Sequence, residues 1–97
     1  MHAVVNKLTL AKPIDDALLA KLEAFNKGLR SEPDIFDNML VRVSDTEAVV
    51  VALFHTREGM ERFSREVAGP WFAEHVRPYL GGPVSRVTGE VVASVRT

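Results

Sequence analysis

The feature that most constrains this chain is an uninterrupted apolar run at residues 48–54, with the sequence Ala-Val-Val-Val-Ala-Leu-Phe. Its β-branched residues favour a strand, and because neighbouring side chains of a strand point to opposite faces, both faces of this strand are apolar. An antiparallel strand covered on one side only should instead alternate apolar and polar residues. The run therefore predicts a strand that needs a cover on each face.

Three further strands are predicted, at residues 2–10, 35–43 and 84–95. In the first of them, alternate positions from residue 4 to residue 10 are apolar, with Asn6 as the polar exception. The last strand places Val87, Val91 and Val95 on one face by the same alternation. Each of these segments is bounded by proline, glycine or polar residues, as strands usually are.

Two helical regions are predicted between the strands. Residues 14–29 repeat apolar side chains with a helical period, and Pro13 suits the first turn of that helix. A second helix begins after Thr56, a good N-cap residue. The adjacent Gly69 and Pro70 should interrupt this second helix, and a shorter helical piece should follow from residue 71 to about residue 80.

The resulting order is β-α-β-β-α-β, which predicts an α+β, ferredoxin-like fold with a four-stranded antiparallel sheet and both helices on one face. All of residues 1–97 are assigned to this single domain. The other face of the sheet is then bare, although residues 48–54 are apolar on both sides. A second copy, packed sheet against sheet, is the simplest cover, and we therefore expect a homodimer.

Composition excludes several classes of function. The formal net charge is −1 and the basic residues are scattered, so neither nucleic acid nor a membrane surface is an expected partner. The chain has no cysteine, which excludes disulfides, thiolate metal sites and a cysteine nucleophile and fits a cytoplasmic location. No signal peptide or membrane-spanning segment is expected. The three histidines have no metal-ligand spacing, so no metal site is predicted.

A few residues could carry chemistry. Asn6, inside an apolar strand face, either binds a ligand or satisfies neighbouring backbone groups, and residue type alone favours the second interpretation. Trp71 and His75 are four residues apart and share a helix face, where His75 could act as a base, a proton shuttle or a ligand. A partly exposed histidine beside a core tryptophan is the plainer interpretation. Tyr79 could donate a hydrogen bond to a carbonyl, although a helix-end tyrosine more often only packs.

The chain resembles the dimeric α+β barrel superfamily, specifically the antibiotic biosynthesis monooxygenase-like domains. The resemblance covers almost the whole chain and depends on four segments: residues 6–10 (Asn-Lys-Leu-Thr-Leu), 54–58 (Phe-His-Thr-Arg-Glu), 69–75 (Gly-Pro-Trp-Phe-Ala-Glu-His) and 78–83 (Pro-Tyr-Leu-Gly-Gly-Pro). It implies a dimer whose two sheets close a barrel, with a cleft between helices and sheet in each subunit. Cofactor-free members of the superfamily oxidise quinols or polyketide-type aromatics in that cleft with O2.

Our leading hypothesis from this resemblance is a cofactor-independent monooxygenase that acts on a small aromatic or quinol-like substrate. Asn6 would orient a substrate oxygen, His75 would be the base or proton shuttle, and Phe63, Trp71 and Tyr79 would form the walls. A second hypothesis is haem binding or degradation with His75 as axial ligand. In the haem-degrading branch a tryptophan stands where this chain has Phe63, which cannot donate a hydrogen bond. A third hypothesis is a non-catalytic binding or interaction module with the same fold.

Overall fold

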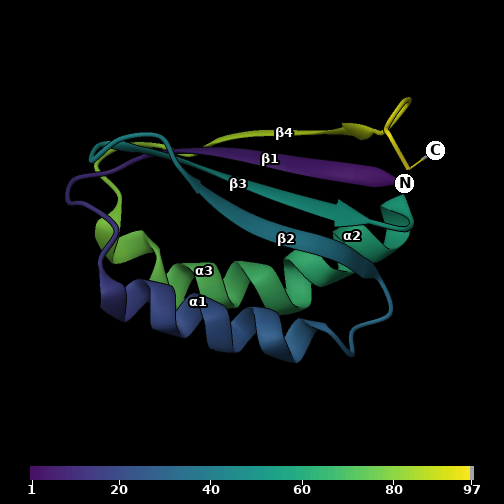
Figure 1. Ribbon diagram of the computed structural model, residues 1–97, viewed down its shortest axis with the longest axis horizontal. Helices are drawn as coiled ribbons and strands as arrows, with labels where there is room; N and C mark the ends of the chain where they lie inside the picture. Colours follow the sequence, from purple (N-terminus) through teal and green to yellow (C-terminus); the bar gives the residue numbers. More distant parts are fainter. Residues whose placement is uncertain (97) are drawn as a thin grey trace.

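The computed structural model describes residues 1–96 as two layers, an antiparallel sheet and a layer of helices that covers one of its faces (Figure 1). The sheet has four strands in the order β2-β3-β1-β4. The predicted β-α-β-β-α-β order is confirmed. In chain order the elements are β1 (His2–Thr9), α1 (Asp16–Leu29), β2 (Ile35–Arg42), β3 (Glu47–Phe54), α2 (Arg57–Phe63), a π-helical turn η1 (Ser64–Ala68), α3 (Gly69–His75), a short 3₁₀ turn η2 (Arg77–Tyr79) and β4 (Ser85–Glu90).

The face of the sheet that carries the helices is set by the alternation in the two central strands, β1 and β3. Val50 of β3 lies opposite Leu40 of β2 on one side and Asn6 of β1 on the other, and Asn6 in turn lies opposite Arg86 of β4. These four residues form one row across the sheet beneath the helices. The row is apolar at the β2 end and polar at the β4 end.

The opposite face of the sheet is apolar along the next row. Met39, Val51, Val5 and Val87 lie opposite one another from β2 to β4. Val87 is 64% exposed and Met39 is 39% exposed, while Val5 and Val51 are half-buried. The sequence prediction that residues 48–54 are apolar on both faces is therefore confirmed, and the second face lies open in the protomer.

The second helical region does not break at Gly69 and Pro70, contrary to prediction. Pro70 has no N–H to donate to the carbonyl four residues earlier, and the N–H of Gly69 instead bonds to the carbonyl of Ser64, five residues back. The helix thus widens into the π-helical turn η1 and continues as α3. A Cβ at position 69 would lie 2.8 Å from the Ser64 oxygen, so this turn requires glycine.

Both helices begin at polar N-caps. Thr56 caps α2 as predicted, because its hydroxyl oxygen accepts a hydrogen bond from the N–H of Gly59 at 3.0 Å. The predicted start of the first helix is wrong by about half a turn. Asp15 is the cap, accepting from Leu18 N–H at 2.9 Å, so Pro13 lies before the helix. Within residues 1–96, no helix is both long enough and apolar enough to cross a membrane.

The last strand is shorter than predicted. It ends at Glu90, whose partner in β1 is His2, and the N–H of Val91 then bonds to the carbonyl of Met1 at 2.9 Å. Beyond this bond, residues 91–96 lie outside the sheet. A strand needs a neighbour for its hydrogen bonds, and the apolar alternation of residues 84–95 could not show where that neighbour ends.

The core consists of two clusters of buried side chains between the layers. One gathers around Leu8, Leu18 and Tyr79, and the other around Phe54 and Phe63. Members of both clusters also line the space described next. The sheet and helices are therefore joined by packed side chains around a cavity rather than by a continuous core.

Candidate functional site

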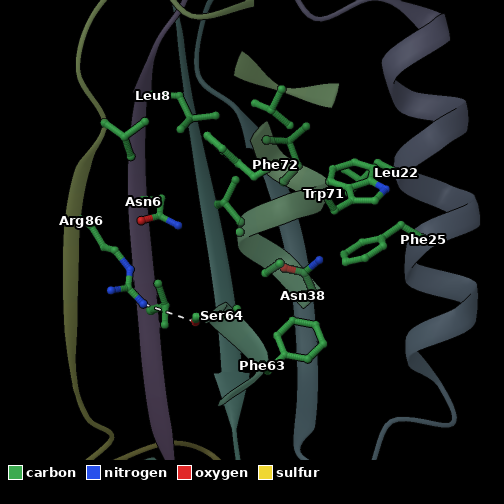
Figure 2. Close-up of a pocket in the computed structure, with 18 of the residues that line it drawn as sticks. Asn6, Leu8, Leu22, Phe25, Asn38, Phe63, Ser64, Trp71, Phe72 and Arg86 are labelled. Carbon is green, nitrogen blue, oxygen red and sulfur yellow. Dashed lines mark hydrogen bonds between the residues drawn. The ribbon is translucent and has the colours of Figure 1, made fainter. Parts of the chain in front are cut away.

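A cavity of about 600 Å³ lies between the sheet and the helices, a size typical of small-molecule sites. Side chains from β1, β2, β3 and β4 form its floor, and α1, α2, η1 and α3 form its roof (Figure 2). Most of the lining is aliphatic or aromatic. The polar side chains are few: Asn6, Asn38, Glu61, Ser64, Arg65, Tyr79, Arg86 and Thr88.

The Asn6 side chain projects from the middle of β1 into this cavity (Figure 2). Its Oδ1 is buried and has no hydrogen-bond partner among residues 1–96. The interpretation that residue type alone favoured, an asparagine satisfied by neighbouring backbone, is therefore wrong. An unpaired buried oxygen is unfavourable by about 1–3 kcal/mol, so an asparagine kept at this position is typical of a residue with a role other than stability.

A second asparagine in the same cavity behaves differently. Asn38 of β2 donates from Nδ2 to Oδ1 of Asn26 on α1 at 2.8 Å. This bond ties α1 to the edge of the sheet. Sequence reasoning did not single out Asn38, and the contrast between the two asparagines shows that burial in the cavity does not by itself leave an amide unpaired.

A polar corner formed by Asn6, Arg86 and Ser64 lies at the β4 side of the cavity. Arg86 neighbours Asn6 across the β1–β4 ladder, and its Nη2 donates to Oγ of Ser64 on η1 at 3.3 Å (Figure 2). Sequence reasoning missed both Arg86 and Ser64. The alternation around Val87 does put Arg86 on the face opposite to the valines, but only the pairing of β4 with β1 places it beside Asn6.

Aromatic side chains form the wall on the helix side. Trp71 of α3 stacks on Phe25 of α1 with ring centroids 4.5 Å apart, and both rings line the cavity (Figure 2). Phe63 also lines it, although it is almost fully buried against Phe54 at 5.5 Å. The structure thus brings Asn6, Phe63 and Trp71 to one cavity, as the sequence predicted.

His75 does not join them. It is not among the residues that line the cavity, and its ring packs on Trp71 at 4.8 Å, with Nε2 3.7 Å from a carboxylate oxygen of Glu74. The side chain is 22% exposed. The predicted meeting of Asn6 and His75 across one cavity is therefore not observed: Trp71 lines the cavity, and His75 contacts Trp71 without lining it.

Tyr79 lines the cavity as predicted, but its hydroxyl is already engaged. It donates to Oδ1 of Asp15 at 2.7 Å, and the ammonium of Lys12 lies 4.3 Å from its ring centre. This hydrogen bond raises the pKa of Tyr79 and, with the N–H of Leu18, lowers the pKa of Asp15. The bond fixes the start of α1, and the hydroxyl is not free to donate to a substrate carbonyl.

The donor set does not fit an axially ligated haem. The residues that line the cavity include no histidine. Over the described part of the chain, no three His, Asp or Glu side chains gather as a metal-binding group. His75, the predicted axial ligand, thus lies outside the lining of this cavity.

Solved structures confirm the predicted likeness of fold to antibiotic biosynthesis monooxygenase-like domains. SnoaB from Streptomyces nogalater, a cofactor-independent oxygenase, matches with a TM-score of 0.72 and 14% identity over 99% of this chain and 97% of its own. Rv0793 from Mycobacterium tuberculosis matches with a TM-score of 0.72 and 18% identity over 97% of each chain.

A third structure, described as an antibiotic biosynthesis monooxygenase, matches with a TM-score of 0.74 and 15% identity over 96% of this chain and 100% of its own. No sequence-family model and no curated protein matches the chain. At these identities the likeness establishes the fold.

Proposed function

We propose that this protein is a cofactor-independent monooxygenase acting on a small aromatic or quinol-like substrate. The observation that carries the proposal is the unpartnered Asn6 amide inside an apolar cavity of about 600 Å³. Such a cavity binds an apolar ring system, and a single unsatisfied amide fixes its orientation through one oxygen. The structural likeness to SnoaB, a cofactor-independent oxygenase, supports the reaction class.

The electrons in such a reaction come from the substrate. A methylene carbon between aromatic rings, as in an anthrone, loses a proton to give a carbanion that the rings and the oxygen substituent stabilise. The carbanion reduces O2, and the carbon becomes a carbonyl. One oxygen atom enters the product and the other leaves as water, so the four electrons lost by the carbon are the four that O2 accepts.

The protein's part is to bind, orient and desolvate the substrate. The Asn6 amide would donate to the substrate oxygen on which negative charge develops, where a fixed dipole away from water is most effective. Phe25 and Trp71 would hold the ring plane by stacking. Exclusion of water from the apolar lining strengthens these interactions.

The proton would pass to water at the open side of the cavity in this proposal. His75 was our sequence-based choice of base, but it contacts Trp71 and is not itself among the lining residues. We therefore propose that His75 positions the Trp71 ring by packing against it. Tyr79 keeps its predicted place in the wall, without a role in proton transfer because Asp15 holds its hydroxyl.

Oxygen consumption with a panel of anthrones and hydroquinones tests the proposed reaction. We expect the unmodified protein to consume one O2 per substrate and Asn6→Leu to lose about 100-fold in turnover, as removal of one oxyanion donor does. Lys21→Ala, on the exposed side of α1, is the control and should match the unmodified protein. His75→Ala should retain most of the turnover, whereas turnover would be largely lost if His75 were the base that deprotonates the substrate.

No oxygen uptake and no binding by any compound of the panel would contradict the proposal. That result would favour the third hypothesis, a non-catalytic binding or interaction module with the same fold. A Soret band on mixing with haemin would favour the second hypothesis, haem binding. The ligand of the haem iron would then have to be a residue outside the cavity lining.

We also propose that the protein is a homodimer packed sheet against sheet. The support is the apolar open face, on which Val41 and Val87 are 44% and 64% exposed in the protomer. A contiguous patch of this kind is unusual on a monomer, and a second copy buries it on both partners. Light scattering that finds a stable monomer would contradict this proposal.

A further inference from the structure

Arg86 differs from the other charged side chains of the cavity. Glu61 accepts a hydrogen bond from Arg57 at 3.1 Å, and Arg65 lies 3.7 Å from Glu66. Arg86, by contrast, has no carboxylate within ion-pair distance among residues 1–96.

The only hydrogen bond of the Arg86 side chain within the described chain goes to the Ser64 hydroxyl, at 3.3 Å. Its guanidinium has five N–H donors, so most of them are free. β4 is an edge strand and Arg86 is exposed, so this cation lies on the solvent side of the cavity that it lines.

The position of Arg86 relative to Asn6 defines two adjacent polar contacts. The two residues are directly opposite in the β1–β4 ladder, and such pairs have Cβ atoms roughly 5 Å apart. Asn6 Oδ1 is enclosed, and Figure 2 shows its Nδ2 on the side of the aromatic residues, so Nδ2 is the Asn6 atom that a bound molecule meets. Nδ2 donates only, and the guanidinium of Arg86 is satisfied best by an anionic group. A bound molecule that contacts both residues therefore needs an acceptor oxygen for Asn6 and, for the strongest binding, an anionic group for Arg86.

We infer that the substrate is a hydroxyaryl carboxylate, whose carboxylate pairs with Arg86 while the oxygen of a hydroxyl on the same edge of the ring accepts a hydrogen bond from Nδ2 of Asn6. This inference rests on the proposed function and names its substrate class. A carboxylate is planar and matches the guanidinium fork, and one such group balances Arg86, the one cation of the cavity lining that has no carboxylate partner within residues 1–96. A phosphate dianion would call for a second cation, and the other arginine of the lining is beside Glu66. The aromatic body then lies on the Phe25–Trp71 side, away from the polar corner.

Calorimetric titration with three naphthalene probes tests this inference without turnover. Naphthol carries only the hydroxyl, naphthoate only the carboxylate, and hydroxynaphthoate carries both on adjacent carbons. We expect hydroxynaphthoate to bind the unmodified protein about 10-fold or more tightly than naphthol, as a charge-assisted hydrogen bond would give. The preference should weaken as salt is raised.

Matched variants test which residues cause the preference for hydroxynaphthoate over naphthol. Arg86→Gln should bind hydroxynaphthoate and naphthol about equally, with the affinity for naphthol unchanged, and Arg86→Lys should keep part of the preference. Arg65→Gln is the control, because it removes another arginine of the same cavity that is already beside a carboxylate. Asn6→Leu should bind hydroxynaphthoate no better than naphthoate.

The outcomes separate this inference from the proposed function. Equal affinity of the unmodified protein for naphthol and hydroxynaphthoate, or a preference that survives Arg86→Gln, would overturn the inference. Oxygen uptake with neutral hydroquinones would then still support the monooxygenase. A carboxylate preference lost in Arg86→Gln, without oxygen uptake on any hydroxyaryl carboxylate, would support the inferred ligand class and contradict the monooxygenase.

Discussion

Replacing Asn6 by leucine should stabilise the protein while it removes the proposed function. The amide has no partner among the residues described, and an unsatisfied buried amide costs about 1–3 kcal/mol. Leucine has nearly the same shape and adds apolar contact with a largely aliphatic lining. For a domain of this size, 1 kcal/mol raises Tm by roughly 4–8 °C, so Asn6→Leu should unfold several degrees above the unmodified protein.

The second asparagine of the cavity supplies the control. Asn38→Leu is the same chemical change but removes a 2.8 Å hydrogen bond to Asn26, so Tm should fall by an amount that corresponds to about 1 kcal/mol. Differential scanning calorimetry measures the Tm of both variants, at one fixed protein concentration because the stability of an oligomer depends on concentration. A decrease of Tm in Asn6→Leu equal to that in Asn38→Leu would show that the Asn6 amide is structural, and the argument for a ligand-binding amide would fail.

Three further predictions address the open face, the π-helical turn and the start of α1. Val51 lies in the middle of the open face, and Val51→Glu would bury an unpaired carboxylate in a sheet-to-sheet dimer. Light scattering should therefore find monomers of this variant. A dimer mass unchanged from that of the unmodified protein would exclude this face as the interface. Gly69→Ala should lower the free energy of unfolding in urea by about 1–3 kcal/mol, because its Cβ would lie 2.8 Å from the carbonyl oxygen of Ser64. Gly28→Ala is the control and should stabilise the protein slightly, because a Cβ there has no other atom within 4 Å. Equal effects of the two substitutions would contradict the contact predicted at position 69. Because Tyr79 lowers the pKa of Asp15, the carboxylate stabilises the fold above its unfolded pKa of about 3.9, and this contribution is lost as pH falls through the lower folded value. In Tyr79→Phe, the free energy of unfolding should therefore decrease less between neutral and acidic pH than it does in the unmodified protein. If the urea midpoints of both proteins varied identically with pH, Tyr79 would not be the group that lowers the pKa of Asp15.

The π-helical turn shows how a local sequence signal can be read correctly and still mislead. Gly69 and Pro70 do disturb the helix, but they widen it rather than end it, because the displaced N–H finds the Ser64 carbonyl one residue further back. The spacing of Trp71 and His75 did predict their contact, at 4.8 Å between ring centres. Which of the two rings faces the cavity depends on the rotation of the helix after this turn, and sequence spacing does not define that rotation.

The sequence by itself determined the element order, the apolar character of both faces of residues 48–54, the cap at Thr56 and the position of Asn6 on an apolar strand face. These properties follow from periodicity and local hydrogen bonding, which act over a few residues. Only the tertiary structure decided that Oδ1 of Asn6 has no partner within residues 1–96, that Arg86 lies beside Asn6 and that Trp71 lines the cavity while His75 does not. The physical reason is that hydrogen-bond partners and side-chain neighbours across a cavity come from segments far apart in the chain, and strand pairing and helix rotation bring them together.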